Sequence, residues 1–133
     1  MIPKFRAYHK KSKKMLKVFA IDFSYESVEI EVPNAEEYIP TDMIQLDVAV
    51  EEDLSKVELM QSTGLKDKNG KEIFVGDIIE VETKSGVVCG DVKYKPCSFM
   101  VCSEDMDRIM FNDWSYEIKG NIYENPELME VGE

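Results

Sequence analysis

Glycine, lysine and carboxylate residues are concentrated in Leu59–Thr83, which reads "LMQSTGLKDKNGKEIFVGDIIEVET". Such a composition suggests a loop that binds phosphate or calcium. In a Walker A loop a lysine precedes a Ser or Thr that binds magnesium, but here Glu72 follows Lys71 and the glycines stand one residue too far apart. An EF-hand needs oxygen ligands at alternate positions, and the stretch offers only Asp67 and Asn69. A dinucleotide-binding glycine pattern is absent as well, so the stretch predicts none of these ligands.

The chain has one histidine and three cysteines, the side chains most often used in metal and nucleophilic sites. Cys89, Cys97 and Cys102 lack the paired spacing of a zinc site. We interpret them as reduced thiols that fill strand positions. His9 stands in a lysine-rich loop, where we expect it to be exposed and to lack an acid-base partner.

Three aspartates near the C-terminal end, Asp105, Asp107 and Asp113, are the remaining candidates for a metal cluster. A charged turn explains their spacing more simply. We therefore predict no catalytic residue, no metal and no cofactor, and a protein that is not an enzyme.

Charge is unevenly distributed along a chain whose formal net charge is -11. Lysine and arginine crowd the first seventeen positions, whereas residues 18–65 and the region from Ser98 onward are strongly acidic. We interpret the basic head as a solvated turn, as a contact with a subunit or partner protein, or as a contact with nucleic acid. The last is disfavoured because an acidic protein repels phosphates at long range. The candidate contact residues in this head are Lys10, Lys11, Lys13 and Lys14.

Alternation of polar and apolar residues predicts strands in the first part of the chain. Residues 3–8 and 15–23 flank the polar run "HKKSKK" and predict a hairpin. The run "SVEIEVP" at residues 27–33 predicts another strand, which its proline ends.

Residues 34–60 leave several alternatives open. A short helical turn before Pro40 and a strand with alternating apolar residues up to Val50 are both expected. After them, Asp53 could cap a one-turn helix, or Val57 could begin another strand.

The second half contains short β-branched or aromatic runs with turn signals every 8–12 residues or so, which is typical of a small barrel or a meander. Asn125 followed by Pro126 predicts the start of a short C-terminal helix. The predicted fold is mainly β, α+β at most: an N-terminal hairpin region, a small SH3-like β-barrel or meander, and a short C-terminal helical turn. The expected divisions are residues 1–60, 61–124 and 125–133.

Within the glycine-rich stretch, each glycine predicts a corner. Asn69-Gly70 predicts a type I′ hairpin turn. Gly64 predicts a bend or bulge. Gly76 and Asp77 predict a tight turn into a strand, with the carboxylate accepting backbone N–H groups.

Exposed charges around these corners are further candidates for a partner contact: Lys66, Asp67, Lys68 and Lys71. Trp114 is expected in the core or in a subunit contact, with an exposed recognition patch as the alternative.

Three blocks carry a resemblance to a known family: "KFRAYHKKSKKML" at 4–16, "ELMQSTGLKDKNGKEIFVGDIIEV" at 58–81 and "IKGNIYENPELM" at 118–129. Together they resemble the YopX family of small proteins encoded by phages and prophages of Gram-positive bacteria. The resemblance implies a mainly β protein in a phage or prophage accessory setting in the bacterial cytoplasm, and assembly into homo-oligomers. It supplies no catalytic residues.

The function expected from these observations is a non-enzymatic accessory protein that binds a host or phage protein and self-assembles. A nucleic-acid-binding barrel is the alternative, with aromatic residues for stacking beside Lys93 and Lys95: Tyr94, Phe99, Phe111 and Trp114. A third hypothesis is an acidic mimic of nucleic acid that inhibits a host DNA-binding protein. Its carboxylates would be Glu29, Glu31, Glu51, Glu52 and Asp53.

The chain contains no apolar run near the ~20 residues that a membrane span needs. Its first residues lack the apolar region and cleavage site of a signal peptide. We therefore expect a cytoplasmic protein in the bacterial host cell, with no membrane partner.

Overall fold

A computed structural model describes residues 4–31, 49–84, 86–95, 98–103, 107–110 and 114–130. The chain divides into two units, Ile2–Met60 and Gln61–Glu133, and each is described on its own. Almost all of the described elements are strands, so the expectation of a mainly β protein is confirmed. No helix in the described ranges is long and apolar enough to cross a membrane.

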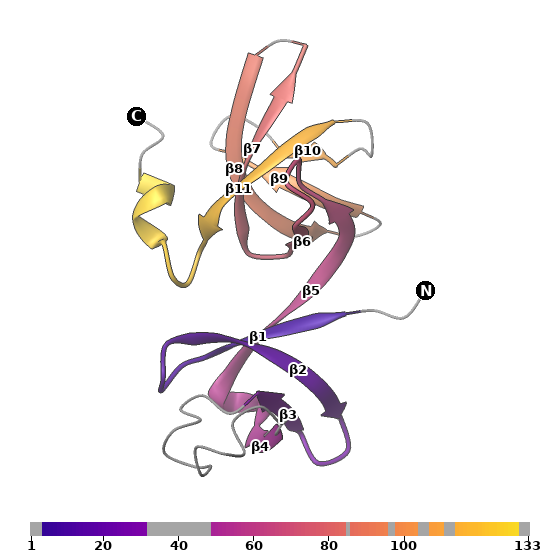
Figure 1. Cartoon of the computed structure of the whole chain (residues 1–133), viewed down its shortest axis with the longest axis vertical. Helices are drawn as coiled ribbons and strands as arrows, with labels where there is room; N and C mark the ends of the chain where they lie inside the picture. The colour runs from indigo at the N-terminus through magenta and orange to yellow at the C-terminus, as the bar shows by residue number, and fades with distance from the viewer. Residues whose placement is uncertain are drawn as a thin grey trace. The chain divides into compact units, whose positions relative to one another are not determined.

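The N-terminal unit is an antiparallel sheet (Figure 1). Its elements are β1 (Phe5–His9), β2 (Lys14–Asp22), β3 (Ser27–Glu31), β4 (Ala49–Asp53), the 3₁₀ turn η2 (Leu54–Lys56) and the start of β5 (Val57–Lys66). In sheet order, β4, β3, β2, β1 and β5 are neighbours, and β6 follows β5. The predicted hairpin and the strand at "SVEIE" are therefore confirmed.

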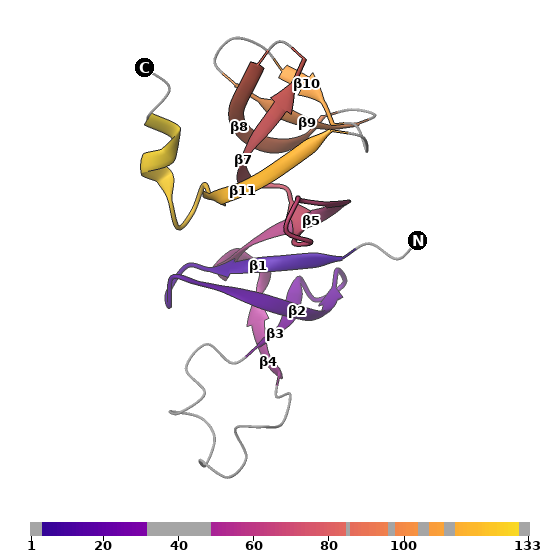
Figure 2. The ribbon, with the colours of Figure 1, turned by 45° about the horizontal axis from the view of Figure 1, so that its top comes forward.

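The core of this unit comes from the inward positions of its strands. Ala7, Leu16, Val28, Ile30 and Val57 are buried together. Because side chains alternate across a strand, Glu29, which lies between the core residues Val28 and Ile30, points to solvent. Figure 2 shows β1 and β2 side by side, in agreement with their antiparallel pairing.

Residues 34–48 lie outside the described ranges, and so do the expectations that fall on them. For the segment after Asp53, a one-turn helix and a strand from Val57 were the two alternatives, and both elements are present. The Asp53 carboxylate accepts the Ser55 N–H at 2.9 Å and caps η2, and β5 then begins at Val57.

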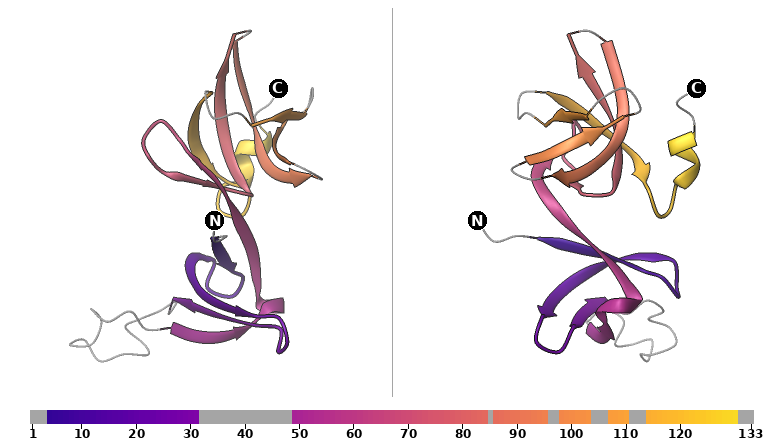
Figure 3. Two further views of the ribbon diagram at one scale, coloured as in Figure 1. Left: turned by 90° about the vertical axis from the view of Figure 1, so that its right-hand side faces the viewer. Right: turned by 180° about the vertical axis from the view of Figure 1, so that it is seen from behind.

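The C-terminal unit contains the end of β5, then β6, which pairs with β5, and a second antiparallel sheet of five strands; Figure 3 shows the ribbon from two further sides. Its elements are β6 (Glu72–Phe74), β7 (Asp77–Thr83), β8 (Gly86–Lys95), β9 (Ser98–Cys102), β10 (Asp107–Ile109), β11 (Ser115–Asn121) and the 3₁₀ turn η3 (Pro126–Glu130). The five-stranded sheet runs β10, β9, β8, β7, β11. Strands β7 to β10 form a meander, and β11 returns to pair with β7. Among the described residues the outer strands β10 and β11 are not paired with each other, so the sheet is not a closed barrel.

The core of the C-terminal unit is formed by Ile73, Ile79, Val81, Val92, Val101 and Tyr116. The predicted helical turn after Asn125 is present as η3, with the Leu128 N–H donating to the Asn125 carbonyl at 3.1 Å. Gly64 has φ of 81° where the β5 and β6 register shifts, which confirms the predicted bulge.

The prediction of a type I′ turn at Asn69-Gly70 is wrong. Only Gly70 has positive φ, at 82°, and Asn69 does not. The Gly70 N–H donates to the Asp67 carbonyl, and the Asp67 N–H donates to the Lys71 carbonyl. This pattern is that of a turn followed by a left-handed glycine, a longer connection than the two-residue loop. The corner at Gly76 matches its prediction: the Asp77 carboxylate accepts the Phe74 N–H at 2.8 Å.

Candidate functional site

The lysine-rich head folds as the turn between β1 and β2. Lys13 takes a left-handed conformation, φ 59°, and its N–H donates to the His9 carbonyl at 2.8 Å. All four lysines of this turn are exposed. We call them the basic turn: Lys10, Lys11, Lys13 and Lys14.

His9 anchors the basic turn, and the expectation that it is exposed is wrong. Only 5% of the residue is exposed. Nδ1 accepts the Ser12 backbone N–H at 3.2 Å and lies 2.7 Å from Ser12 Oγ, while Nε2 lies 3.1 Å from Glu52 Oε2. Because Nδ1 accepts a backbone N–H, we assign the ring proton to Nε2, where it donates to the carboxylate. The spacing of His9 and Ser12 was the only sequence signal for this arrangement.

A groove of about 580 Å³ opens beside the buried histidine. We call it the His9 groove; its lining residues are His9, Lys10, Lys11, Glu52, Ser55 and Lys56. The Lys10 ammonium is held at one side of it, 3.1 Å from the Ser55 carbonyl oxygen and 3.2 Å from Glu58 Oε1. Lys11 and Lys56 have no ion pair with any described residue.

Acidic side chains gather on one face of β3 and β4. Glu29 pairs directly with Glu51, Glu31 with Ala49, and Ser27 with Asp53. Directly paired residues share one face of a sheet, so these carboxylates form a patch that we call the acidic face. Its members are Glu29, Glu31, Glu51 and Asp53.

The sequence analysis placed Glu52 among these acids, but its side chain lies on the opposite face of the sheet. It pairs with the buried Val28 and reaches His9. The remaining members are exposed, except that Glu31 is half-buried and accepts the Lys17 N–H at 3.1 Å. Hydrogen bonds from the side chain and backbone of Ser55 lower the pKa of Asp53. Asp53 therefore stays ionised at neutral pH.

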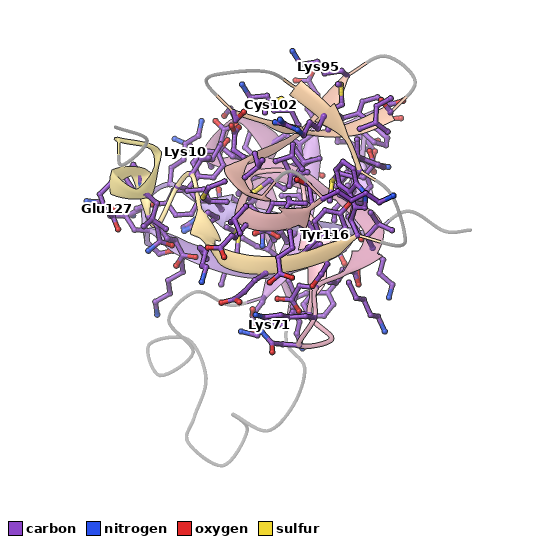
Figure 4. The ribbon with its side chains drawn as sticks, turned by 90° about the horizontal axis from the view of Figure 1, so that it is seen from above. Lys10, Lys71, Lys95, Cys102, Tyr116 and Glu127 are labelled. Carbon is purple, nitrogen blue, oxygen red and sulfur yellow. The ribbon has the colours of Figure 1, made fainter. Side chains whose placement is uncertain are left out.

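Asp67 is buried, so the expectation that it offers an exposed charge is wrong. Its Oδ1 accepts the N–H groups of Asn69 and Lys71, both at 2.9 Å, and Oδ2 accepts the Ile118 N–H at 3.2 Å. Burial raises the pKa of Asp67, but these N–H groups outweigh burial and leave it below its usual value. The carboxylate thus joins the turn to β11, and Figure 4 labels Lys71 on this turn and Tyr116 on β11.

The other candidates near this turn have different surroundings. Lys68 forms an ion pair with Glu117, which also binds Lys119 at 2.7 Å. Lys66 and Lys71 are exposed. Trp114 is partly buried and packs against the core of the C-terminal sheet.

Among the described residues, the cysteine and aspartate candidates do not come together as a metal site. Cys89 is exposed and Cys102 is buried, while Cys97 lies outside those ranges. Although the Cys89 residue is exposed, partial desolvation of its thiol and the nearby Glu80 carboxylate raise its pKa. Asp107 begins β10, and Asp105 and Asp113 fall outside the description. No group of three or more metal-binding side chains occurs among the residues that were described.

The described part of the chain is a small, mainly β protein built on two antiparallel sheets. The chain belongs to the YopX family, because the family described as "YopX protein" matches residues 4–130. Among solved structures, it is similar to protein EF1440 from Enterococcus faecalis, at 28% identity and a TM-score of 0.66 over 97% of this chain and 99% of that one. It is also similar to protein yopX from Bacillus subtilis, at 21% identity and a TM-score of 0.58 over 93% of this chain and 95% of that one. No protein with a curated description matches it.

Proposed function

We propose that this protein is a non-enzymatic accessory protein that acts through protein contacts and self-assembly. The setting is the one that the family resemblance implies, a phage or prophage product in the bacterial cytoplasm. The observation that carries the proposal is the pair of oppositely charged surfaces on one small sheet, the basic turn and the acidic face. In self-assembly, the basic turn of one subunit docks on the acidic face of the next.

The physical support lies in the placement of the charges. Glu29 and Glu51 are like charges directly opposite each other, an arrangement that costs stability. The basic turn is held in one conformation by His9, so its lysines meet a partner with less loss of entropy than a loose loop would. Complementary patches of this kind contribute to specificity and to the rate of association.

A non-enzymatic role agrees with the contacts of His9. Its Nδ1 is occupied by a backbone N–H and its Nε2 by Glu52, so both ring nitrogens serve to fix the turn. A general base needs a ring nitrogen within reach of a substrate proton.

Light scattering of the purified chain at low and high salt tests the proposal. We expect assemblies at about 20 mM NaCl that dissociate at about 500 mM, because salt screens contacts between exposed charges. A monomer at every salt and protein concentration would rule out self-assembly.

Single-stranded nucleic acid is a second candidate partner, favoured by one observation. The rings of Tyr94 and Phe99 lie 5.1 Å apart, and Tyr94 is 60% exposed between the exposed Lys93 and Lys95. Exposed rings beside lysines can stack on bases. A gel-shift titration at about 50 mM salt tests this candidate, since phosphate contacts are strongest at low salt, and no retardation of DNA or RNA would end it.

The acidic face also supports mimicry of nucleic acid. A DNA-binding protein that recognises rows of phosphates could be occupied by the carboxylates of β3 and β4. Competition with DNA for host DNA-binding proteins tests this version, and the E29Q/E51Q variant should lose the competition. Equal competition by the wild-type chain and that variant would reject it.

A further inference from the structure

We propose that the His9 groove is a binding site for an extended acidic peptide segment of a partner protein. One carboxylate of the segment pairs with Lys11 and a second with Lys56. The inference rests on the proposed function only in taking the basic turn as a protein-contact surface, and it does not require self-assembly.

The charges around the groove differ in how they are balanced. The Glu52 carboxylate accepts a hydrogen bond from His9 Nε2, and the Lys10 ammonium forms an ion pair with Glu58. Lys11 and Lys56 have no direct ion pair among the described residues, and Lys56 has only the longer-range attraction of Asp53. The groove therefore offers two separate ammonium groups to a ligand with two negative charges.

The size of the groove favours a peptide over a single ion. Its volume of about 580 Å³ falls within the range of sites that hold drug-sized ligands, roughly 300–1,000 Å³. One carboxylate or phosphate would fill little of it. A peptide segment of a few residues supplies both the bulk and the two charges.

The acids that surround the groove disfavour nucleic acid in the same place. Glu52 lines the groove, Glu58 lies beside Lys10, and Asp53 is close enough to Lys56 for that lysine to lower the pKa of its carboxyl. A nucleic-acid strand needs a positive track that continues along several phosphates. The positive charge here is compact and enclosed by carboxylates, which suits a ligand with a few localised charges.

Fluorescence anisotropy with a labelled tetraglutamate peptide tests the site on the full chain. We expect binding at about 20 mM NaCl, and no binding of the matched tetraglutamine peptide. The K11Q/K56Q variant should bind about tenfold more weakly, since it loses two exposed ion pairs with the peptide and each contributes only modestly. The control K17Q/K84Q removes the same charge at exposed lysines outside the groove and should stay within about twofold.

Three results would overturn the inference: no binding of tetraglutamate, an equal loss in K17Q/K84Q, or tighter binding of an oligothymidylate than of tetraglutamate. Circular dichroism of both variants checks that they are folded. If the peptide fails to bind while light scattering detects assembly, this inference alone fails. If the peptide binds and the chain is a monomer at every salt, only self-assembly fails.

Discussion

Glu29 of β3 and Glu51 of β4 lie directly opposite each other, and both side chains are exposed. The pairing is surrounded by further carboxylates on the same face, Glu31 and Asp53. A sheet optimised for stability alone would place an opposite charge or a β-branched residue at one of these positions. Substitutions at this pair can therefore show whether the acidic face lowers the free energy of unfolding.

Glu51→Lys should stabilise the folded protein. The change replaces repulsion from Glu29 with an attractive cross-strand pair, worth roughly 0.5–1 kcal/mol in the free energy of unfolding. Urea unfolding at about 20 mM NaCl measures it, and the gain should shrink at about 500 mM. A gain of the same size at both salt concentrations would mean that charge is not its cause.

Asp67→Ala should destabilise the C-terminal unit by about 2–4 kcal/mol, because it leaves backbone N–H groups of the turn and of Ile118 without an acceptor. Asn69→Ala is the matched control in the same turn. The Asn69 side chain is exposed, so this change should stay within about 0.5 kcal/mol. Similar losses in the two variants would contradict the role of the carboxylate.

The pH dependence of stability should also report Asp67. Its pKa is lowered on folding from the usual 3.8, so its contribution is present in full above that value and is lost as pH falls through the folded pKa. Wild-type stability should therefore fall below about pH 4, and Asp67→Asn should flatten this part of the curve. Parallel curves for the two proteins would contradict the prediction.

Glu117 should titrate at an unusually low pH. Its hydrogen bonds with Lys119 and Lys68 lower its pKa from 4.5 to about 2. The NMR titration of its side-chain carboxyl should therefore have a midpoint well below that of an ordinary glutamate. Lys119→Gln should raise the midpoint more than Lys68→Gln, and the opposite order would contradict the contacts described.

Gly90→Ala should be poorly tolerated. A Cβ at Gly90 would lie 2.8 Å from the Cys102 carbonyl carbon, inside van der Waals contact with the backbone. We expect a loss of about 1–3 kcal/mol in thermal or urea unfolding. The neighbouring Cys89→Ala, at an exposed position, should cost under about 0.5 kcal/mol, and equal losses in the two variants would contradict the crowding.

The sequence predicted the strands well because their signals are local. Alternation marked β1, β2 and β3, and the corner at Gly76 needed only the adjacent Asp77. The Asn69-Gly70 pair alone predicts a two-residue turn, whereas Asp67 shapes the observed turn by accepting the N–H groups of Asn69, Gly70 and Lys71. The Asp67 carboxylate also binds the Ile118 N–H, 51 residues along the chain. No local pattern contains that contact.

The candidate site was predicted in part for a similar reason. The basic turn contains four lysines interrupted only by Ser12, so composition alone identified it. The acidic face required the register of β3 and β4, and seventeen residues, 32–48, separate these strands in the described structure. A short turn fixes the register of two strands, whereas a long connection does not. For the same reason the sequence could not separate Glu52 from its neighbours or foresee that it meets His9.

We propose that the basic turn of one subunit docks on the acidic face of another. Exchanging charges between these two surfaces tests the docking most directly. Sedimentation velocity would compare K11E/K13E with E29K/E51K, each alone and mixed, at about 20 mM NaCl. K11E/K13E leaves two lysines and two glutamates in the basic turn, and E29K/E51K leaves two lysines and two carboxylates on the acidic face. Each variant alone therefore loses the charge of one of its two surfaces and should be a monomer. The mixture should form complexes, because the unchanged acidic face of K11E/K13E can bind the unchanged basic turn of E29K/E51K. Assembly of either variant alone, or a mixture that stays monomeric while the wild-type chain assembles, would contradict the claim.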